Sequence, residues 1–251
     1  MRIIASTFSI LLFASVAFGQ KHSITVYLAG DSTMAQKQPH KRPETGWGEM
    51  LQQYFDANKV KIENRAVNGR STKSFIAEGR WQQIADNLKK GDYVFIEFGH
   101  NDEKSEDPTR YAAPNTDYRN NLIKFVTEVR MKKAFPVLLT PVMRRKFDTG
   151  GNFQDTHGEY PDSVRKVAQE LKVPLIDMHR KSEAVLKDYG AEKSRTLFLQ
   201  LKAGENPNYP NGAEDNTHFN LTGAEAMAKL AVEAIREQKI GLRKYLKKQE
   251  K

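Results

Sequence analysis

A near-continuous apolar run in the first half of the chain constrains the fold more than any other stretch. Residues Asp92 to Gly99 read Asp-Tyr-Val-Phe-Ile-Glu-Phe-Gly, without the strict alternation that a strand with one solvated face shows. Such a run is typical of a parallel strand that is covered on both faces. It ends in Gly99-His100-Asn101-Asp102, where a polar loop begins.

Strand and helix patterns alternate on both sides of this run. Right-handed crossovers would then place the carboxyl ends of all strands at one rim of a parallel sheet. The region 181–215 is less regular, and we expect one helix and a long loop there. The other strands are expected at 24–30, 60–67, 136–142 and 173–178, and the helices at 46–58, 72–88, 117–132, 161–171 and 221–238.

The first 19 residues have the pattern of a secretory signal peptide. Arg2 precedes a mostly apolar stretch, and Ala17-Phe18-Gly19 offers a small-residue cleavage site. The apolar core is short for a spanning helix, which needs about 20 residues. Cleavage would leave residues 20–251, a length that suits one α/β domain. The sequence therefore predicts an exported protein, periplasmic or extracellular, with no membrane segment after cleavage.

The composition excludes several classes of site. The chain has no cysteine, which rules out a thiol nucleophile and every cysteine metal site. Lys and Arg number 40 against 31 Asp and Glu, a formal net charge of +9. A basic surface can attract an anionic polymer. No nucleic-acid-binding motif accompanies the charge, so we do not expect a nucleic-acid partner.

Reactive groups follow several of the predicted strands. Gly30-Asp31-Ser32 ends the first strand and places a hydroxyl where α/β sheets present groups to ligands. Taken alone, this motif favours an ordinary strand-to-loop turn or a Ser or Thr that caps the next helix. Gly69 and Asn101 follow the second and third strands and offer hydrogen-bond donors.

A base with its orienting group is found late in the chain. Asp215 lies three residues before His218, in what reads as a polar loop before the last helix. Acyl transfer needs a nucleophile, a base, an orienting group and donors for the oxyanion, and these residues together would supply all four. Asp and His are also a plausible metal pair, but no third ligand has a suggestive spacing, so no metal site is predicted.

These motifs resemble the four blocks of the SGNH (GDSL-type) hydrolases, in order and at suitable spacing along the whole mature chain. Within that family the sequence is most similar to rhamnogalacturonan acetylesterases, although esterases of other acetylated glycans share parts of the pattern. The motifs that carry the resemblance are Gly30-Asp31-Ser32-Thr33-Met34-Ala35, Gly46-Trp47-Gly48, Asn68-Gly69-Arg70-Ser71, Phe98-Gly99-His100-Asn101-Asp102, Thr140-Pro141-Val142 with Arg144, Thr156-His157-Gly158-Glu159-Tyr160-Pro161, and Asp215 with His218.

The resemblance implies a flavodoxin-like SGNH hydrolase fold, a three-layer α/β/α sandwich with a five-stranded parallel sheet. It implies that Ser32 is the nucleophile, that His218 is the general base and then the acid, and that Asp215 orients His218. The backbone N–H groups of Ser32 and Gly69 and the side-chain amide of Asn101 would form the oxyanion hole. No cofactor is implied.

Other rim residues have two readings each. Arg144 could pair with galacturonate carboxylates, and a solvated rim is the alternative. His157 could contact substrate, and a solvated loop histidine is the alternative. Asp31, His100 and Asp102 are expected to support the turns rather than take part in the chemistry.

The sequence thus predicts an exported esterase that removes acetyl groups from a plant cell-wall polysaccharide, with anionic pectic rhamnogalacturonan as the expected substrate. Xylan, another acetylated glycan, a lipid or a small acyl ester is the alternative substrate. The mean hydropathy of −0.67 disfavours the large apolar face of a lipase. A non-catalytic glycan-binding protein is a third reading, against which the complete set of catalytic residue types counts.

Overall fold

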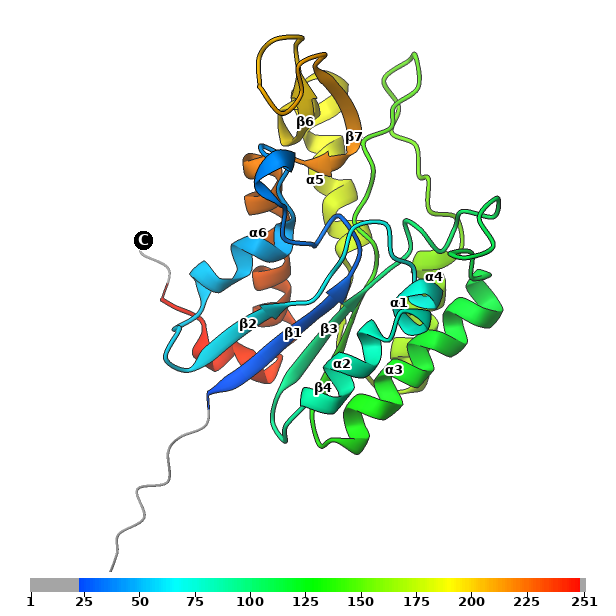
Figure 1. Ribbon diagram of the computed structural model, residues 1–251, viewed down its shortest axis with the longest axis vertical. Helices are drawn as coiled ribbons and strands as arrows, with labels where there is room; N and C mark the ends of the chain where they lie inside the picture. The colour runs from blue at the N-terminus through cyan, green and yellow to red at the C-terminus, as the bar shows by residue number, and fades with distance from the viewer. Residues whose placement is uncertain (1–22, 249–251) are drawn as a thin grey trace, which may run out of the picture.

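Five parallel strands form the centre of the molecule (Figure 1). The computed structural model describes residues 23–248. The strand order is β2-β1-β3-β4-β5, and each neighbouring pair is parallel. The predicted five-stranded parallel sheet is therefore confirmed. The strands are β1 (Ile24–Gly30), β2 (Val60–Asn64), β3 (Tyr93–Glu97), β4 (Phe135–Leu139) and β5 (Leu175–Ile176).

Helices cover both faces of the sheet, which gives the predicted three layers. One face packs against α1 (Thr72–Ala77), α2 (Arg80–Asn87), α3 (Arg119–Met131) and α4 (Tyr160–Glu170). The other face packs against the 3-10 helix η2 (Trp47–Tyr54), α5 (Met178–Lys193), α6 (Leu221–Glu237) and the short η5 (Gly241–Tyr245). Figure 1 shows α2 and α3 on one side of the strands and α6 on the other.

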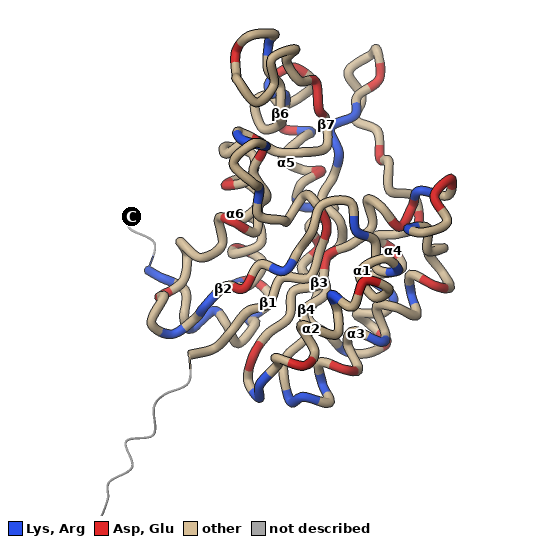
Figure 2. Tube along the Cα trace, in the orientation of Figure 1, with Lys and Arg blue, Asp and Glu red and all other residues tan. Residues whose placement is uncertain are grey.

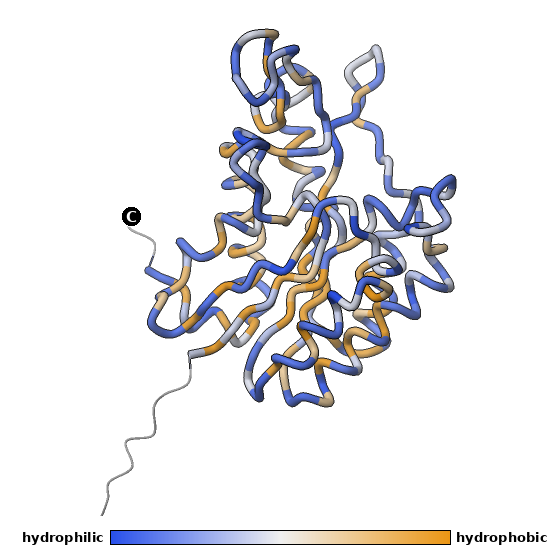
Figure 3. The backbone as a smooth tube through the Cα atoms, viewed as in Figure 1, coloured by the Kyte–Doolittle hydropathy of each residue, from blue (hydrophilic) through white to orange (hydrophobic). Residues whose placement is uncertain are grey.

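The alternation of side chains along β1 explains why both faces are buried. Val26 and Leu28 point into one apolar cluster, and Tyr27 and Ala29 point into the other, because successive strand residues face opposite sides. Figure 3 shows apolar residues concentrated along the central strands, and Figure 2 shows charged residues spread over the surrounding segments. The two apolar clusters are the core of the molecule.

Helical segments differ from the sequence-based boundaries where glycine or proline intervenes. The predicted helix 72–88 is two helices, because Gly79 takes φ of 69°, a left-handed conformation that ends one helix and precedes the next. The stretch expected as a helix at 46–58 is the 3-10 helix η2. A π-turn (Pro114–Tyr118) precedes α3. These changes leave the buried faces of the segments as predicted.

A two-stranded antiparallel hairpin replaces part of the long loop expected before the last helix. Beyond α5 and the 3-10 turn η4 (Ser194–Leu197), β6 (Phe198–Leu201) pairs with β7 (Ala213–Phe219). Asp215 and His218 therefore lie on a strand, not in the expected polar loop. Because β7 reads Ala-Glu-Asp-Asn-Thr-His-Phe, it has no apolar alternation, and its strand conformation comes from pairing with β6.

The predicted signal peptide, residues 1–19, lies outside the described residues. Between residues 23 and 248, no helix is both long and apolar enough to span a bilayer. The two tryptophans pack in the core. Trp47 is 0% exposed and Trp81 is 1% exposed.

The aromatic contacts of Phe125 in α3 predict a strong effect of its truncation. Its ring is fully buried between Trp81, at 4.0 Å between ring centroids, and Phe98, at 6.1 Å. Removing a buried phenyl group leaves a cavity, so Phe125→Ala is expected to lower the free energy of unfolding by about 3–5 kcal/mol. Denaturant unfolding monitored by circular dichroism measures this change.

Phe135→Ala is the matched control, because Phe135 is 51% exposed. Its expected loss is about 1 kcal/mol or less. Equal losses for the two variants would contradict the assignment of the α3 face to the core.

Candidate active site

The polar segments that follow β1, β2 and β3 meet at the carboxyl edge of the sheet. Parallel strands that are joined by crossovers have this edge in common. The backbone N–H of Val67 donates to the carbonyl of Gly30 at 3.0 Å, which joins the first two of these segments. The Asn101 side chain donates to the carbonyl of Arg70 at 3.1 Å, which joins the second and third. The sheet thus places Ser32, Gly69 and Asn101 in one neighbourhood.

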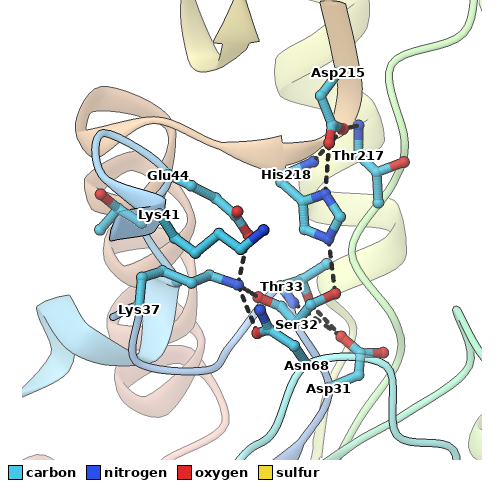
Figure 4. Close-up of polar contacts among 12 residues, drawn as sticks. Asp31, Ser32, Thr33, Lys37, Lys41, Glu44, Asn68, Asp215, Thr217 and His218 are labelled. Atoms are coloured by element: carbon cyan, nitrogen blue, oxygen red, sulfur yellow. Dashed lines mark hydrogen bonds and ion pairs between the residues drawn. The ribbon is translucent and has the colours of Figure 1, made fainter. Parts of the chain in front are cut away.

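A continuous chain of hydrogen bonds connects Ser32, His218 and Asp215 (Figure 4). Ser32 Oγ lies 2.8 Å from His218 Nε2, and His218 Nδ1 lies 2.7 Å from Asp215 Oδ2. The structure therefore brings together three residues that are up to 186 positions apart in sequence. Asp215 and His218 lie where the β6–β7 pairing is interrupted, between the pairs Gln200–Glu214 and Phe198–Phe219, so regular strand alternation does not separate their side chains.

The charge state of Asp215 sets the direction of these bonds. Burial raises the pKa of its carboxyl, but the hydrogen bonds and charge of His218 outweigh burial, so that the pKa lies below its usual range. Backbone N–H groups of Thr217 and His218 also donate to Oδ1, at 2.7 and 2.9 Å. An ionised Asp215 accepts a hydrogen bond from His218 Nδ1–H, which leaves Nε2 to accept the hydrogen bond that the Ser32 hydroxyl donates.

The backbone donors expected for an oxyanion hole are unoccupied by other protein groups. Within residues 23–248, neither the Ser32 nor the Gly69 N–H donates to another protein atom. Gly69 has φ of 77°, and a Cβ there would meet no atom within 4 Å. The glycine is thus explained by its left-handed backbone and not by lack of space.

Asn101 is held in one orientation by two neighbours. Its Oδ1 accepts from Arg110 at 3.3 Å, while its Nδ2 donates to the carbonyl of Arg70. Because the guanidinium of Arg110 can only donate, it fixes which end of the amide carries the N–H groups. One Nδ2 hydrogen remains for a ligand. Asp107 binds the same guanidinium at 2.5 Å and neutralises its charge.

Lys37 is part of this site although no sequence pattern marks it. Its side chain is only 1% exposed, in a segment that reads as a polar loop. Its Nζ donates to the carbonyl of Ser32 at 2.5 Å, to Asn68 Oδ1 at 2.9 Å and to Glu44 Oε1 at 2.7 Å (Figure 4). Burial lowers the pKa of the Lys37 ammonium, and the Glu44 carboxylate opposes that shift. A lysine in a loop is ordinarily solvated, so no pattern in the sequence indicated that Lys37 would be buried.

Buried carboxyl groups support the turns below Ser32. Asp31 Oδ1 accepts from the backbone N–H of Thr33 at 3.0 Å and from its hydroxyl at 2.9 Å, as expected for a brace of this turn. Glu97, at the end of β3, accepts from Trp47 Nε1 at 2.8 Å and from the N–H of Val142 at 3.2 Å. Burial raises the pKa of Glu97 well above its usual range, and the nearby Asp31 adds to the shift.

Asp102 braces the start of α1. Its Oδ1 accepts from the backbone N–H of Thr72 at 2.9 Å and from the Thr72 hydroxyl at 2.5 Å. Burial raises the pKa of Asp102 to about 8, more than these hydrogen bonds lower it. The supporting role expected for Asp102 therefore agrees with its contacts.

Of the two predicted substrate contacts, the structure buries His157 and leaves Arg144 partly exposed. His157 is 1% exposed, and its Nε2 and Nδ1 lie 2.9 Å from the carbonyl of Val142 and 3.1 Å from Glu103 Oε2. A buried imidazole with both nitrogens bonded cannot reach a polysaccharide, so the expected contact of His157 is corrected. Arg144 forms an ion pair with Glu103 and donates to the carbonyl of His100 at 3.3 Å, while its side chain is 21% exposed, so its contact with substrate carboxylates stays a prediction.

Three histidines lie close to one another beside this ion pair. The His100 and His157 rings meet edge to face at 4.6 Å between centroids, and His179 follows at 6.1 Å from His157. Burial lowers the pKa of His100 well below its usual range, and the charges of His157 and Arg144 act in the same direction. Within the described part of the chain, no group of three or more His, Asp or Glu side chains has the arrangement of a metal site.

A comparison with known protein families shows which family this chain matches. Residues 28–226 match the family described as GDSL-like Lipase/Acylhydrolase family. The chain belongs to this family. The resemblance found in the sequence and the predicted fold class are both confirmed, and so is the prediction of a carboxylic-ester hydrolase.

Relatives of this GDSL-family protein cover nearly its whole length. The rhamnogalacturonan acetylesterase RhgT of Bacillus subtilis (strain 168) is 44% identical over 226 residues, which cover 90% of this chain and 95% of the relative. The probable rhamnogalacturonan acetylesterase YesY of the same organism is 37% identical, over 84% of this chain and 92% of the relative. The crystal structure of YxiM of Bacillus subtilis gives a TM-score of 0.74 at 28% identity, over 87% of this chain and 58% of that chain.

The raised pKa of Asp102 predicts a pH-dependent stability of this GDSL-family domain. An unfolded Asp releases its proton near pH 4, whereas the folded protein keeps it up to about pH 8. The free energy of unfolding that this proton contributes is complete below about pH 4 and is lost as the pH rises towards 8. Asp102→Asn, which stays neutral, is expected to lose less stability over this interval than the wild type.

Denaturant unfolding at several pH values across this interval measures the effect. Asp107→Asn is the control, because Asp107 is solvent-accessible and its pKa is lowered to about 2 by the Thr109 and Arg110 side chains. A slope of stability against pH that is the same in Asp102→Asn as in the wild type would show that Asp102 does not carry this proton.

Proposed function

We propose that this protein is an exported acetylesterase that deacetylates pectic rhamnogalacturonan through an acetyl-enzyme on Ser32. The observation that carries the proposal is the unbroken set of bonds from Ser32 Oγ through His218 to Asp215. The unoccupied backbone N–H groups of Ser32 and Gly69 support it. The export part of the proposal is supported by the signal-peptide pattern of residues 1–19 alone.

The first half of the reaction follows from the direction of the bonds. Ser32 Oγ attacks the acetyl carbonyl carbon while His218 Nε2 takes the hydroxyl proton. The negative charge that develops on the carbonyl oxygen is bound by the N–H groups of Ser32 and Gly69 and by the Asn101 amide. Asp215 stabilises the imidazolium that forms. Collapse of the tetrahedral intermediate breaks the bond to the sugar oxygen, which receives the proton from His218.

The second half of the reaction regenerates the enzyme by the same groups. A water molecule gives a proton to His218 Nε2 and attacks the acetyl group on Ser32. The oxyanion is again bound by the backbone donors. Collapse then releases acetate, and Ser32 Oγ takes its proton back from His218.

The choice of an anionic polysaccharide rests on the relatives and on charge. RhgT, at 44% identity, is named a rhamnogalacturonan acetylesterase. The formal charge of +9 favours a polymer that carries carboxylates. A pocket of about 430 Å³ adjoins Gly69, and Arg70, Arg110 and the acidic Glu78 line it. Arg70 is paired with Glu78, and Arg110 is paired with Asp107. Arginine binds carboxylates with favourable geometry.

The proposal is tested by acetate release from acetylated rhamnogalacturonan and acetylated xylan, with the wild type and Ser32→Ala side by side. We expect release from the pectic polymer and a loss of about 10³-fold or more in Ser32→Ala, because no second nucleophile replaces the hydroxyl. Release from xylan alone would overturn the substrate and keep the mechanism. A Ser32→Ala variant as active as the wild type would overturn the mechanism.

Arg70 offers a test of the anionic substrate at the pocket. Its side chain lies at the pocket wall and is paired with Glu78 at 3.1 Å, in an exposed pair that contributes little to stability. Arg70→Gln is expected to raise KM for the pectic polymer about 5-fold, the equivalent of about 1 kcal/mol of lost charge attraction. The KM for a small neutral acetate ester is expected to stay unchanged.

Arg80→Gln is the matched control, because Arg80 pairs with the same Glu78 carboxylate and does not line the pocket. Steady-state kinetics on both substrates at low salt measures the difference. An equal rise of KM in the two variants, or a rise on the neutral ester as well, would contradict a specific role of Arg70 towards carboxylates.

A further inference from the structure

We propose that Lys37 is a positioning residue of the oxyanion hole: its ammonium group fixes the Ser32 backbone relative to the loop that carries Gly69. This inference rests on the acyl-transfer mechanism proposed above. The carrying observation is the juxtaposition of one buried ammonium group with the carbonyl of Ser32 and with the side chain of Asn68, the residue before Gly69.

The ammonium group of Lys37 has the right number of partners for this role. Lysine has three donor hydrogens, and three acceptors surround Nζ within 2.9 Å: the Ser32 carbonyl, Asn68 Oδ1 and Glu44 Oε1. The side chain is 1% exposed, so water does not compete for these hydrogens. Figure 4 shows the Lys37 nitrogen between Ser32, Asn68 and Glu44.

The bond to Ser32 completes a set that fixes both peptide groups around the nucleophile. In the peptide group between Ser32 and Thr33, the Ser32 carbonyl accepts from Lys37, and the Thr33 N–H donates to Asp31 Oδ1 at 3.0 Å. The carbonyl of the preceding peptide, on Asp31, accepts from the N–H groups of Met34 and Ala35 at 3.3 and 3.0 Å. The remaining group of these two peptides is the Ser32 N–H, and its direction is set by the other three.

The bond from Lys37 to Asn68 fixes the residue next to Gly69, which supplies the second backbone N–H. Asn68 accepts from Lys37 through its side chain and from Arg70 through its carbonyl, at 2.9 Å in both cases. Gly69 lies between Asn68 and Arg70 in the chain, and its backbone is left-handed. The bond from Val67 to Gly30 joins the two segments at the sheet edge, and Lys37 joins them again at Ser32 and Asn68, next to the two N–H groups, so its removal would let the separation of these groups vary.

Glu44 explains why a charged group can lie at this position. An ammonium group without a counter-charge would be costly to bury, and the Glu44 carboxylate at 2.7 Å provides one. Thr45, the next residue, donates its N–H to the carbonyl of Phe219 at 2.9 Å, next to His218 in the chain. The segment that neutralises Lys37 is thus also attached to the strand that carries the base.

A buried ion pair that only holds the loop in place is the competing explanation, and a double variant separates the two. Lys37→Met keeps the side-chain volume but leaves Glu44 buried without its partner, and it is expected to be destabilised. Adding Glu44→Gln removes that unpaired charge. The measurements are the thermal midpoint, kcat and KM on a small neutral acetate ester, and the rate at which a phosphonate ester labels Ser32. The exposed Lys229→Met on α6 is the control for loss of one positive charge.

If Lys37 positions the donors, Lys37→Met/Glu44→Gln recovers most of the thermal midpoint while kcat stays about 10²-fold below the wild type, since a small misplacement of catalytic groups has that effect. KM stays within about 3-fold, and phosphonylation slows with kcat. Glu44→Gln alone weakens the ion pair but retains Lys37 and an amide oxygen as its third acceptor, so its kcat is expected to fall clearly less than that of the double variant.

Two results would overturn the proposal. One is a double variant with kcat close to the wild type. The other is a loss of kcat in Glu44→Gln as large as in the double variant, which would assign the effect to loop folding. If Lys37→Met alone does not fold, the double variant and Glu44→Gln decide the question. Activity retained by Ser32→Ala in the same assay would instead refute the proposed mechanism, whatever Lys37 does.

Discussion

The peptide group between Ser32 and Thr33 is bonded at both ends, and the geometry of the site depends on it. Its carbonyl accepts from the buried Lys37 ammonium, and its N–H donates to Asp31. Both partners come from the segment that immediately surrounds the turn, and both are buried. Ser32 Oγ can therefore meet a base from a distant part of the chain at a fixed point, because the turn itself has little freedom to move.

The sheet supplies the frame, and the hairpin supplies the base. Parallel strands bring three short segments to one edge, which accounts for Ser32, Gly69 and Asn101. His218 comes from β7, the second strand of the hairpin, which helix α5 separates from β5, the last strand of the central sheet. Polar groups that the core would otherwise exclude are concentrated here: Asp31, Glu97 and Asp102 are all buried close to this edge, and burial raises the pKa of each. A buried carboxyl near an active site is a common place for such shifts.

Patterns of apolar residues predicted the fold, whereas contacts between residues far apart in the sequence could not be predicted from these patterns. The runs at β1, β3 and β4 are apolar because both faces are covered, and the sequence shows this directly. The hairpin was missed because β7 has no alternation of its own. Lys37 was not singled out, and the burial of His157 was not expected, for one reason: charged or polar loop residues are normally solvated. Only the fold shows that Glu44 and Glu103 pair with these two side chains in the interior. Ser32, Asp215 and His218 were found because their order resembles a known family.

The central claim is that Ser32 carries the acetyl group during turnover, and mass spectrometry of the enzyme quenched while it hydrolyses acetylated rhamnogalacturonan tests it most directly. The account predicts an acetyl ester on the peptide that contains Ser32, fragmentation that places it on the Ser32 oxygen, and its absence in Ser32→Ala. An acetyl group on another residue, or steady release of acetate by Ser32→Ala, would contradict the account.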